Sequence, residues 1–146
     1  HPEAKNTQAD LDWLRAKIDA GASEAITQFF FDAETFLRFR DRAAAAGVAA
    51  PIIPGILPIE DWAKTSKFAE ACGAIIPDEL RAAFDVAVRD DRADLLAIAQ
   101  AAELVDTLVC EGCDHLHFYT LNRPELTRDV CTALGLAPRP SLSRVA

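Results

Sequence analysis

Residues 24–32 read Glu-Ala-Ile-Thr-Gln-Phe-Phe-Phe-Asp, and this stretch decides the fold of the chain. Its apolar residues, Ile26 and 29–31, form a nearly continuous run that is typical of a strand buried on both faces. Gln28 lies inside the run. Because a buried amide is costly unless it is paired, we expect Gln28 to satisfy a neighbour or to face a ligand. Asp32 ends the run and is a good N-cap for a following helix. Parallel α/β folds place their chemistry at such strand ends.

The rest of the chain alternates between helix patterns and apolar strand patterns. Strands are predicted at 25–31, 51–57 and 115–120. Helices are predicted at 4–20, 32–47, 61–72, 77–86, 93–110 and 124–134. This alternation indicates an α/β fold with a parallel sheet and right-handed crossovers. Pro54 and Gly55 should end ordinary pairing in the second strand and bend its end.

The composition excludes several classes of protein. The chain has 146 residues, one domain's worth, and is 51% hydrophobic, enough for a core. The net charge of −8 and the scattered Lys and Arg argue against a nucleic-acid-binding surface. The longest uncharged run, 43–59, is interrupted by prolines and is therefore not a membrane helix. Four cysteines in a soluble acidic chain suggest reduced thiols and a cytoplasmic location. The absence of methionine suggests a fragment or a processed chain.

The segment Cys110-Glu-Gly-Cys113-Asp-His115-Leu-His117 has the side chains that a zinc site needs. The expected geometry is unfavourable, however, because Cys110 lies at a helix end and the histidines follow a strand that should be buried. We therefore predict no metal site here. The alternative is that the thiols lie in the core or at the surface and that the histidines are paired within the protein.

Three further features each have a functional and a structural interpretation. Asp10 and Lys17 lie seven residues apart on one helix face. They form either a solvated face or a contact in which Lys17 meets a phosphate and Asp10 accepts from a ribose hydroxyl. Phe68, on the third predicted helix, is either a core residue or a ligand platform. Arg123 follows a strand end, where it either clamps a carboxylate or phosphate or simply begins a helix at the surface.

The chain resembles the methylenetetrahydrofolate reductase family at three motifs in order and in register. They are Thr-Gln-Phe-Phe-Phe-Asp at 27–32, Ile-Pro-Gly-Ile-Leu-Pro at 53–58 and His-Phe-Tyr-Thr-Leu-Asn-Arg at 117–123. The resemblance covers nearly the whole chain. It implies that residues 1–136 are the C-terminal half of a flavin-dependent (β/α)8 TIM barrel, with three parallel strands and flanking helices, and that 137–146 form a loose tail.

The resemblance also implies an activity. In this family, FAD accepts a hydride from NADH or NADPH and passes it to 5,10-methylenetetrahydrofolate, giving 5-methyltetrahydrofolate for one-carbon metabolism and methionine biosynthesis. The implied partners are the missing N-terminal half of the barrel and further copies in a homo-oligomer. The alternatives are a half-barrel fragment without catalysis and another folate- or flavin-binding barrel.

The resemblance assigns roles to seven residues of this sequence. The FAD-binding residues are His1, Asp10 and Lys17. Four residues are assigned to the folate or the nicotinamide. Gln28 hydrogen-bonds the pterin or the nicotinamide amide, and Phe68 stacks on either substrate. Arg123 contacts the folate, and Lys64 stands where some members have a glutamine near the folate.

Some features of the family lie elsewhere or differ here. Trp13 and Ala16 stand where some members have polar residues facing the FAD nucleotide. The general-acid glutamate and the aspartate near the flavin ring belong to the N-terminal half, so no catalytic residue is predicted in this chain. Alone, the chain is expected to self-associate and to be inactive. The candidates for its unfinished core face are Phe29, Phe31, Ile53 and Phe118.

Overall fold

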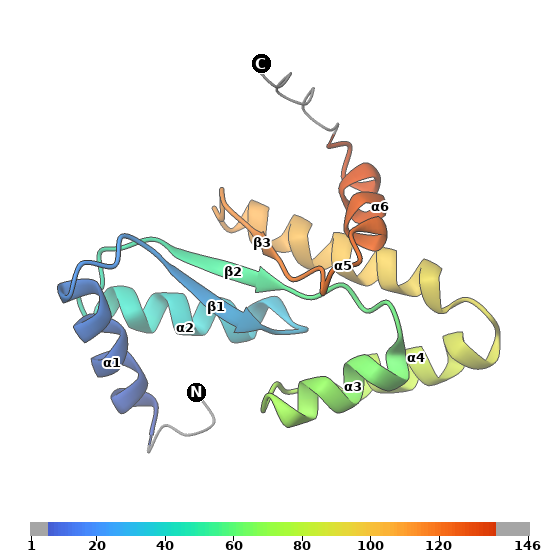
Figure 1. The fold of residues 1–146 in the computed structure, drawn as a ribbon, viewed down its shortest axis with the longest axis horizontal. Helices are drawn as coiled ribbons and strands as arrows, with labels where there is room; N and C mark the ends of the chain where they lie inside the picture. Colours follow the sequence, from blue (N-terminus) through green and yellow to red (C-terminus); the bar gives the residue numbers. More distant parts are fainter. Residues whose placement is uncertain (1–5, 137–146) are drawn as a thin grey trace.

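The computed structural model describes residues 6–136, which form an α/β arrangement with a three-stranded parallel sheet (Figure 1). The strands lie in the order β1 (Ala25–Phe29), β2 (Ile52–Ile56) and β3 (His117–Phe118). The helices are α1 (Thr7–Asp19), α2 (Ala33–Ala45), α3 (Trp62–Ala71), α4 (Asp78–Arg89), α5 (Ala93–Cys110) and α6 (Glu125–Ala133). The predicted order of helices and strands is confirmed. The predicted tail, 137–146, lies outside the described residues.

Side-chain caps set where three helices begin. Asp32 accepts a hydrogen bond from Thr35 N at 2.9 Å and so caps α2, as predicted. Asp61 accepts from Lys64 N at 3.0 Å and caps α3. Asn6 accepts from Ala9 N at 2.9 Å at the start of α1. Each cap satisfies a backbone N–H that has no partner inside its helix.

β1 contains one more residue than β2 between two successive pairs of the ladder. Ile26 pairs with Ile53 and Phe29 pairs with Gly55, so the register shifts between them. The residue of β2 inside this gap is Pro54, which has no N–H to donate. The strand accommodates the proline through a β-bulge and continues to pair, with Gly55 and Ile56 opposite β3. Ordinary pairing is thus interrupted at Pro54, as predicted, but the strand does not end there.

Helices α2 and α5 cover one face of the sheet, and Figure 1 shows both behind the strands. The side chains packed there include Phe30, which directly follows β1, and Ile56 of β2. Phe36 of α2 and Leu108 of α5 pack against them. Phe118 packs against this cluster, so its assignment to an unfinished core face is wrong.

A second hydrophobic cluster lies past the C-terminal ends of β1 and β2. Phe29 and Phe31 are 4% and 5% exposed there, so they are buried rather than part of an unfinished face. Phe84 of α4 is fully buried in this cluster and stacks on Trp62 of α3, with ring centroids 4.8 Å apart. Figure 1 shows α3 and α4 beyond the strand arrowheads. The C-terminal ends of β1 and β2 therefore pack against a buried cluster that contains several aromatic side chains.

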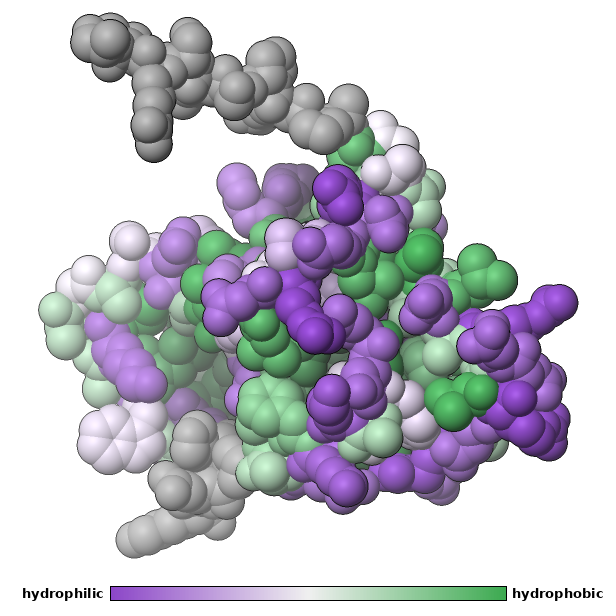
Figure 2. All heavy atoms as spheres, turned by 45° about the vertical axis from the view of Figure 1, so that its right-hand side comes forward, coloured by the Kyte–Doolittle hydropathy of each residue, from purple (hydrophilic) through white to green (hydrophobic). Residues whose placement is uncertain are grey.

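The face of the sheet opposite α2 and α5 is partly open. Ile26 is 46% exposed, and Ile53, its register partner on the same face, is half-buried. The prediction of a first strand buried on both faces is wrong, because Ile26 and Gln28 of β1 are exposed. Figure 2 shows hydrophobic side chains in a hollow at the left of the molecule, whereas hydrophilic side chains cover most of the lower right.

Candidate substrate-binding site

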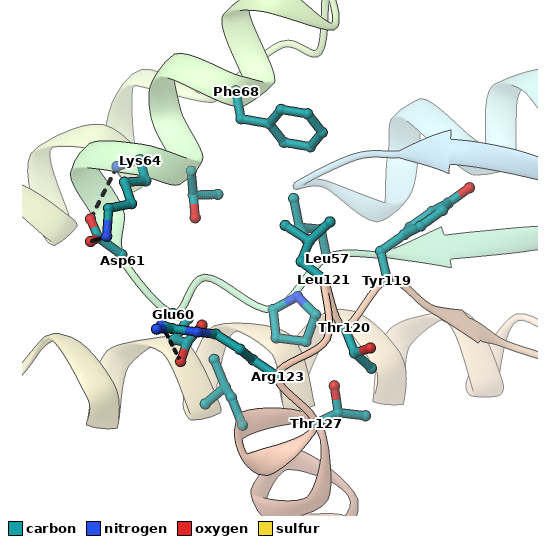
Figure 3. Close-up of a pocket in the computed structure, with 13 residues that line it drawn as sticks. Leu57, Glu60, Asp61, Lys64, Phe68, Tyr119, Thr120, Leu121, Arg123 and Thr127 are labelled. Carbon is teal, nitrogen blue, oxygen red and sulfur yellow. Dashed lines mark hydrogen bonds and ion pairs between the residues drawn. The ribbon is translucent and has the colours of Figure 1, made fainter.

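A cavity of about 260 Å³ opens at the C-terminal ends of β2 and β3. Its walls come from the loop after β2, from one side of α3, and from the loop between β3 and α6 (Figure 3). Lys64, Phe68 and Arg123 all line it. The structure thus brings together three of the four side chains that the sequence assigned to the substrate.

Phe68 links the cavity to the core. Its ring stacks on Phe29 with centroids 5.5 Å apart and planes at 24°, and Phe29 also meets the edge of Tyr119 at 6.3 Å. Phe68 itself remains 42% exposed. In Figure 3 its ring extends from α3 toward the cavity. One face of Phe68 is therefore supported by a buried aromatic, and the residue can offer a flat apolar surface to a planar ligand.

Two ion pairs form the charged rim of the cavity (Figure 3). Lys64 Nζ lies 3.1 Å from Asp61 Oδ2, and Arg123 Nη1 lies 3.0 Å from Glu60 Oε1. Both cations are well exposed, so each pair contributes little to stability and can exchange its partner. Hydrogen bonds from the Lys64 backbone N–H and then from its side chain lower the pKa of Asp61. The rim therefore carries two exposed positive charges, and the lowered pKa favours the ionised form of the Asp61 carboxylate beside Lys64.

A strained turn presents Arg123. Leu121 and Asn122 have φ angles of 48° and 65°, in the left-handed region, and Arg123 N donates to Thr120 O at 2.8 Å. The strain is notable for leucine, whose side chain is 62% exposed here. Strained backbone of this kind concentrates at functional sites. The sequence analysis missed this turn, since Leu121 carries no local signal for a positive φ.

Gln28 is exposed, so the prediction that its amide is buried is wrong. Its Oε1 accepts from Phe29 N at 3.1 Å, within the bulge. Gln28 does not line the cavity, although its neighbour Phe29 supports the cavity residue Phe68. Gln28 therefore lies next to the Phe29–Phe68 pair and outside the cavity lining.

The predicted flavin-binding residues lie on a separate helix. Lys17 is exposed and Asp10 half-buried on α1, which Figure 1 shows at the opposite end of the sheet from α3. The same helix carries Trp13, which is 68% exposed. His1 lies outside the described residues.

The cysteines and histidines of the 110–117 segment are dispersed. Cys113 is buried, and burial raises the pKa of its thiol, whereas Cys110 and His115 are exposed. The third strand is only His117–Phe118, shorter than predicted. Across residues 6–136 no group of three His, Cys, Asp or Glu side chains is arranged to hold a metal ion. In the same part of the chain, no helix is both long enough and apolar enough to cross a membrane.

Comparison with known proteins identifies the family. The family model for methylenetetrahydrofolate reductase matches residues 1–135. The chain is 48% identical over 141 residues to 5,10-methylenetetrahydrofolate reductase of Escherichia coli (strain K12) and 46% identical over 139 residues to that of Pectobacterium carotovorum subsp. carotovorum. Each alignment covers 94% of this chain and 47% of the relative, so the chain spans about half the length of the curated relatives it matches. It belongs to the methylenetetrahydrofolate reductase family.

Proposed function

We propose that residues 1–136 are the C-terminal half of a (β/α)8 barrel that reduces 5,10-methylenetetrahydrofolate to 5-methyltetrahydrofolate with NADH or NADPH. The observation that carries this proposal is the cavity at the strand ends, where Phe68, Lys64 and Arg123 converge. Family membership supports the reaction class. The N-terminal half of the barrel would supply the catalytic acid, and we expect a cytoplasmic homo-oligomer.

The cavity suits a folate, which combines a planar ring system with a carboxylate-bearing tail. Phe68 offers its supported face to the planar part of the ligand. Lys64 and Arg123 can pair with the tail carboxylates by exchanging their present partners, Asp61 and Glu60. The same aromatic face can take the nicotinamide, so the two substrates would occupy the site in turn.

Gln28 is expected to act as a hydrogen-bond donor toward the substrate. Its Oε1 already accepts from Phe29 N, which leaves the amide nitrogen to donate. Within the described residues that nitrogen makes no hydrogen bond. The matching group on the ligand is then an acceptor, such as the carbonyl oxygen of a pterin or of a nicotinamide amide.

The polar side chains of α1 fit the nucleotide part of FAD. Lys17 is exposed and cationic, as a diphosphate contact requires, and Asp10 lies on the same helix with a carboxylate that can accept from a ribose hydroxyl. Bound FAD would supply the hydride relay between the nicotinamide and the folate. His1 is the third proposed contact.

Gln28→Ala, made in a full-length reductase that contains this sequence, tests the proposal. Loss of one specific hydrogen bond of about 1–3 kcal/mol should lower the rates of both half-reactions by about tenfold to a hundredfold. Gln28→Glu should lose as much, because a carboxylate cannot donate. Stopped-flow measurement of flavin reduction and reoxidation gives the two rates.

Gln100→Ala is the matched control, since this amide on α5 donates to Phe31 O at 3.3 Å and lies outside the cavity lining. It should lower stability slightly and leave both rates unchanged. Unchanged rates in Gln28→Ala would remove Gln28 from the site.

Lys17→Ala should weaken FAD retention while leaving the fold intact, because an exposed lysine on a helix contributes little to stability. The measurement is flavin content after dialysis together with the thermal midpoint. Lys67→Ala, an exposed lysine on α3 outside the cavity lining, is the control and should retain flavin. A lowered midpoint with full flavin occupancy would instead make Lys17 a structural residue.

A further inference from the structure

Tyr119 connects all three strands of the sheet. It directly follows β3, and its backbone N–H donates to Ile56 O of β2 at 2.8 Å. Its hydroxyl reaches β1 and donates to Thr27 O at 2.9 Å. Between these points the ring crosses Gly55, where a Cβ atom would lie 2.7 Å from Tyr119 Cε2. Only glycine at this position leaves room for the ring to lie across β2.

The hydroxyl of Tyr119 is bonded at the bulge. Thr27 is one of the residues in the register gap of β1, and its own Oγ1 accepts from Gly55 N at 3.0 Å. That bond satisfies an N–H next to Pro54, where the regular ladder is interrupted. Two side-chain hydrogen bonds therefore replace regular pairing at the bulge. The Tyr119 hydroxyl donates to Thr27 O, and Thr27 Oγ1 accepts from Gly55 N.

The bulge determines the direction of Gln28. The carbonyl of Thr27 belongs to the same peptide group as the Gln28 N–H, so a bond to this carbonyl fixes the orientation of that peptide plane. The next N–H, from Phe29, holds Gln28 Oε1 at 3.1 Å. The Tyr119 hydroxyl is thus linked to the Gln28 amide through two hydrogen bonds and two successive peptide groups, which meet at the Gln28 Cα.

We propose that Tyr119 is a positioning residue, which orients the Gln28 amide toward the substrate by anchoring the β1 bulge through Thr27. The inference rests on the proposed function, in which Gln28 binds the folate or the nicotinamide. Tyr119 also lines the cavity, but its hydroxyl proton is already donated to Thr27 O. We therefore expect the effect of this hydroxyl on binding to be transmitted through the bulge and Gln28.

The test is a double-mutant cycle with Tyr119→Phe and Gln28→Ala in a full-length reductase that contains this sequence. Tyr119→Phe keeps the ring over Gly55 and removes only the hydroxyl. Alone, it should weaken folate binding about threefold to tenfold, the value of one net hydrogen bond. In the Gln28→Ala background it should cause no further loss. Amide hydrogen exchange should become faster in the 25–29 segment and stay unchanged in α2 and α5.

Thr107→Val is the control, because it removes a comparable bond, from Thr107 Oγ1 to Glu103 O at 2.9 Å, on the exposed side of α5. It should leave folate binding unchanged. Additive losses in the cycle would overturn the inference, since Tyr119 would then act independently of Gln28. A lowered thermal midpoint with unchanged folate binding would also overturn it and make Tyr119 structural. Failure of the proposed function is distinguishable, because Gln28→Ala alone would then leave folate binding unchanged.

Discussion

Gly55→Ala is expected to lower the free energy of unfolding by at least about 3 kcal/mol, the upper range for an overpacked core site. A Cβ atom at this position would lie 2.4 Å from the backbone oxygen Thr27 O and 2.7 Å from Tyr119 Cε2. The tyrosine ring can move, but the carbonyl belongs to the neighbouring strand and moves only if the β1–β2 pairing opens. Urea unfolding of the alanine variant and of its parent protein measures the difference.

Gly112→Ala separates this clash from ordinary glycine effects. Gly112 has a φ of 84° with open space around its Cβ position, so its alanine variant should suffer only backbone strain, about 1 kcal/mol. Tyr119→Leu should fail to rescue Gly55→Ala, because it removes the ring contact and leaves the carbonyl contact in place. Equal losses in the two glycine variants would contradict the close approach of β1 to Gly55.

Residues 1–146 expressed alone are expected to self-associate and to have no reductase activity, even with added FAD. In the described part of the chain, β1 and β3 each keep one unpaired edge, and Ile26 exposes 46% of its surface on the uncovered face. Unpaired strand edges beside apolar surface tend to pair with another chain. The general acid is also expected outside these residues. Light scattering and a nicotinamide–quinone assay on the purified chain give the two results.

The matched control is the same chain mixed with the remaining half of a homologous reductase. A soluble complex of the two, with flavin bound and activity restored, would support the half-barrel proposal. A monodisperse monomer that turns over by itself would contradict it, and the catalytic acid would then have to lie within residues 1–146. A monodisperse monomer that binds neither flavin nor folate would favour the non-catalytic alternative.

Some residues of the candidate site could be predicted from the sequence, and others could not. Lys64, Phe68 and Arg123 were assigned by resemblance, and the structure brings them to one cavity. Tyr119, the only tyrosine in the chain, lies within the third of the motifs that carry this resemblance, but its sequence context predicts no role for it. Its hydroxyl meets an atom 92 residues away along the chain, and no local pattern reports such a contact.

The sequence by itself determined the local features of this protein: the order of helices and strands, the cap at Asp32, and the family. These depend on residues within about one turn or one strand of each other. Only the tertiary structure decided that Gln28 is exposed, that Phe118 packs under α5, and that the β1 bulge lies opposite Pro54. The physical reason is that burial and register belong to pairs of segments. The same apolar residue is core or surface according to what covers it, and a one-residue shift in pairing redirects every side chain that follows.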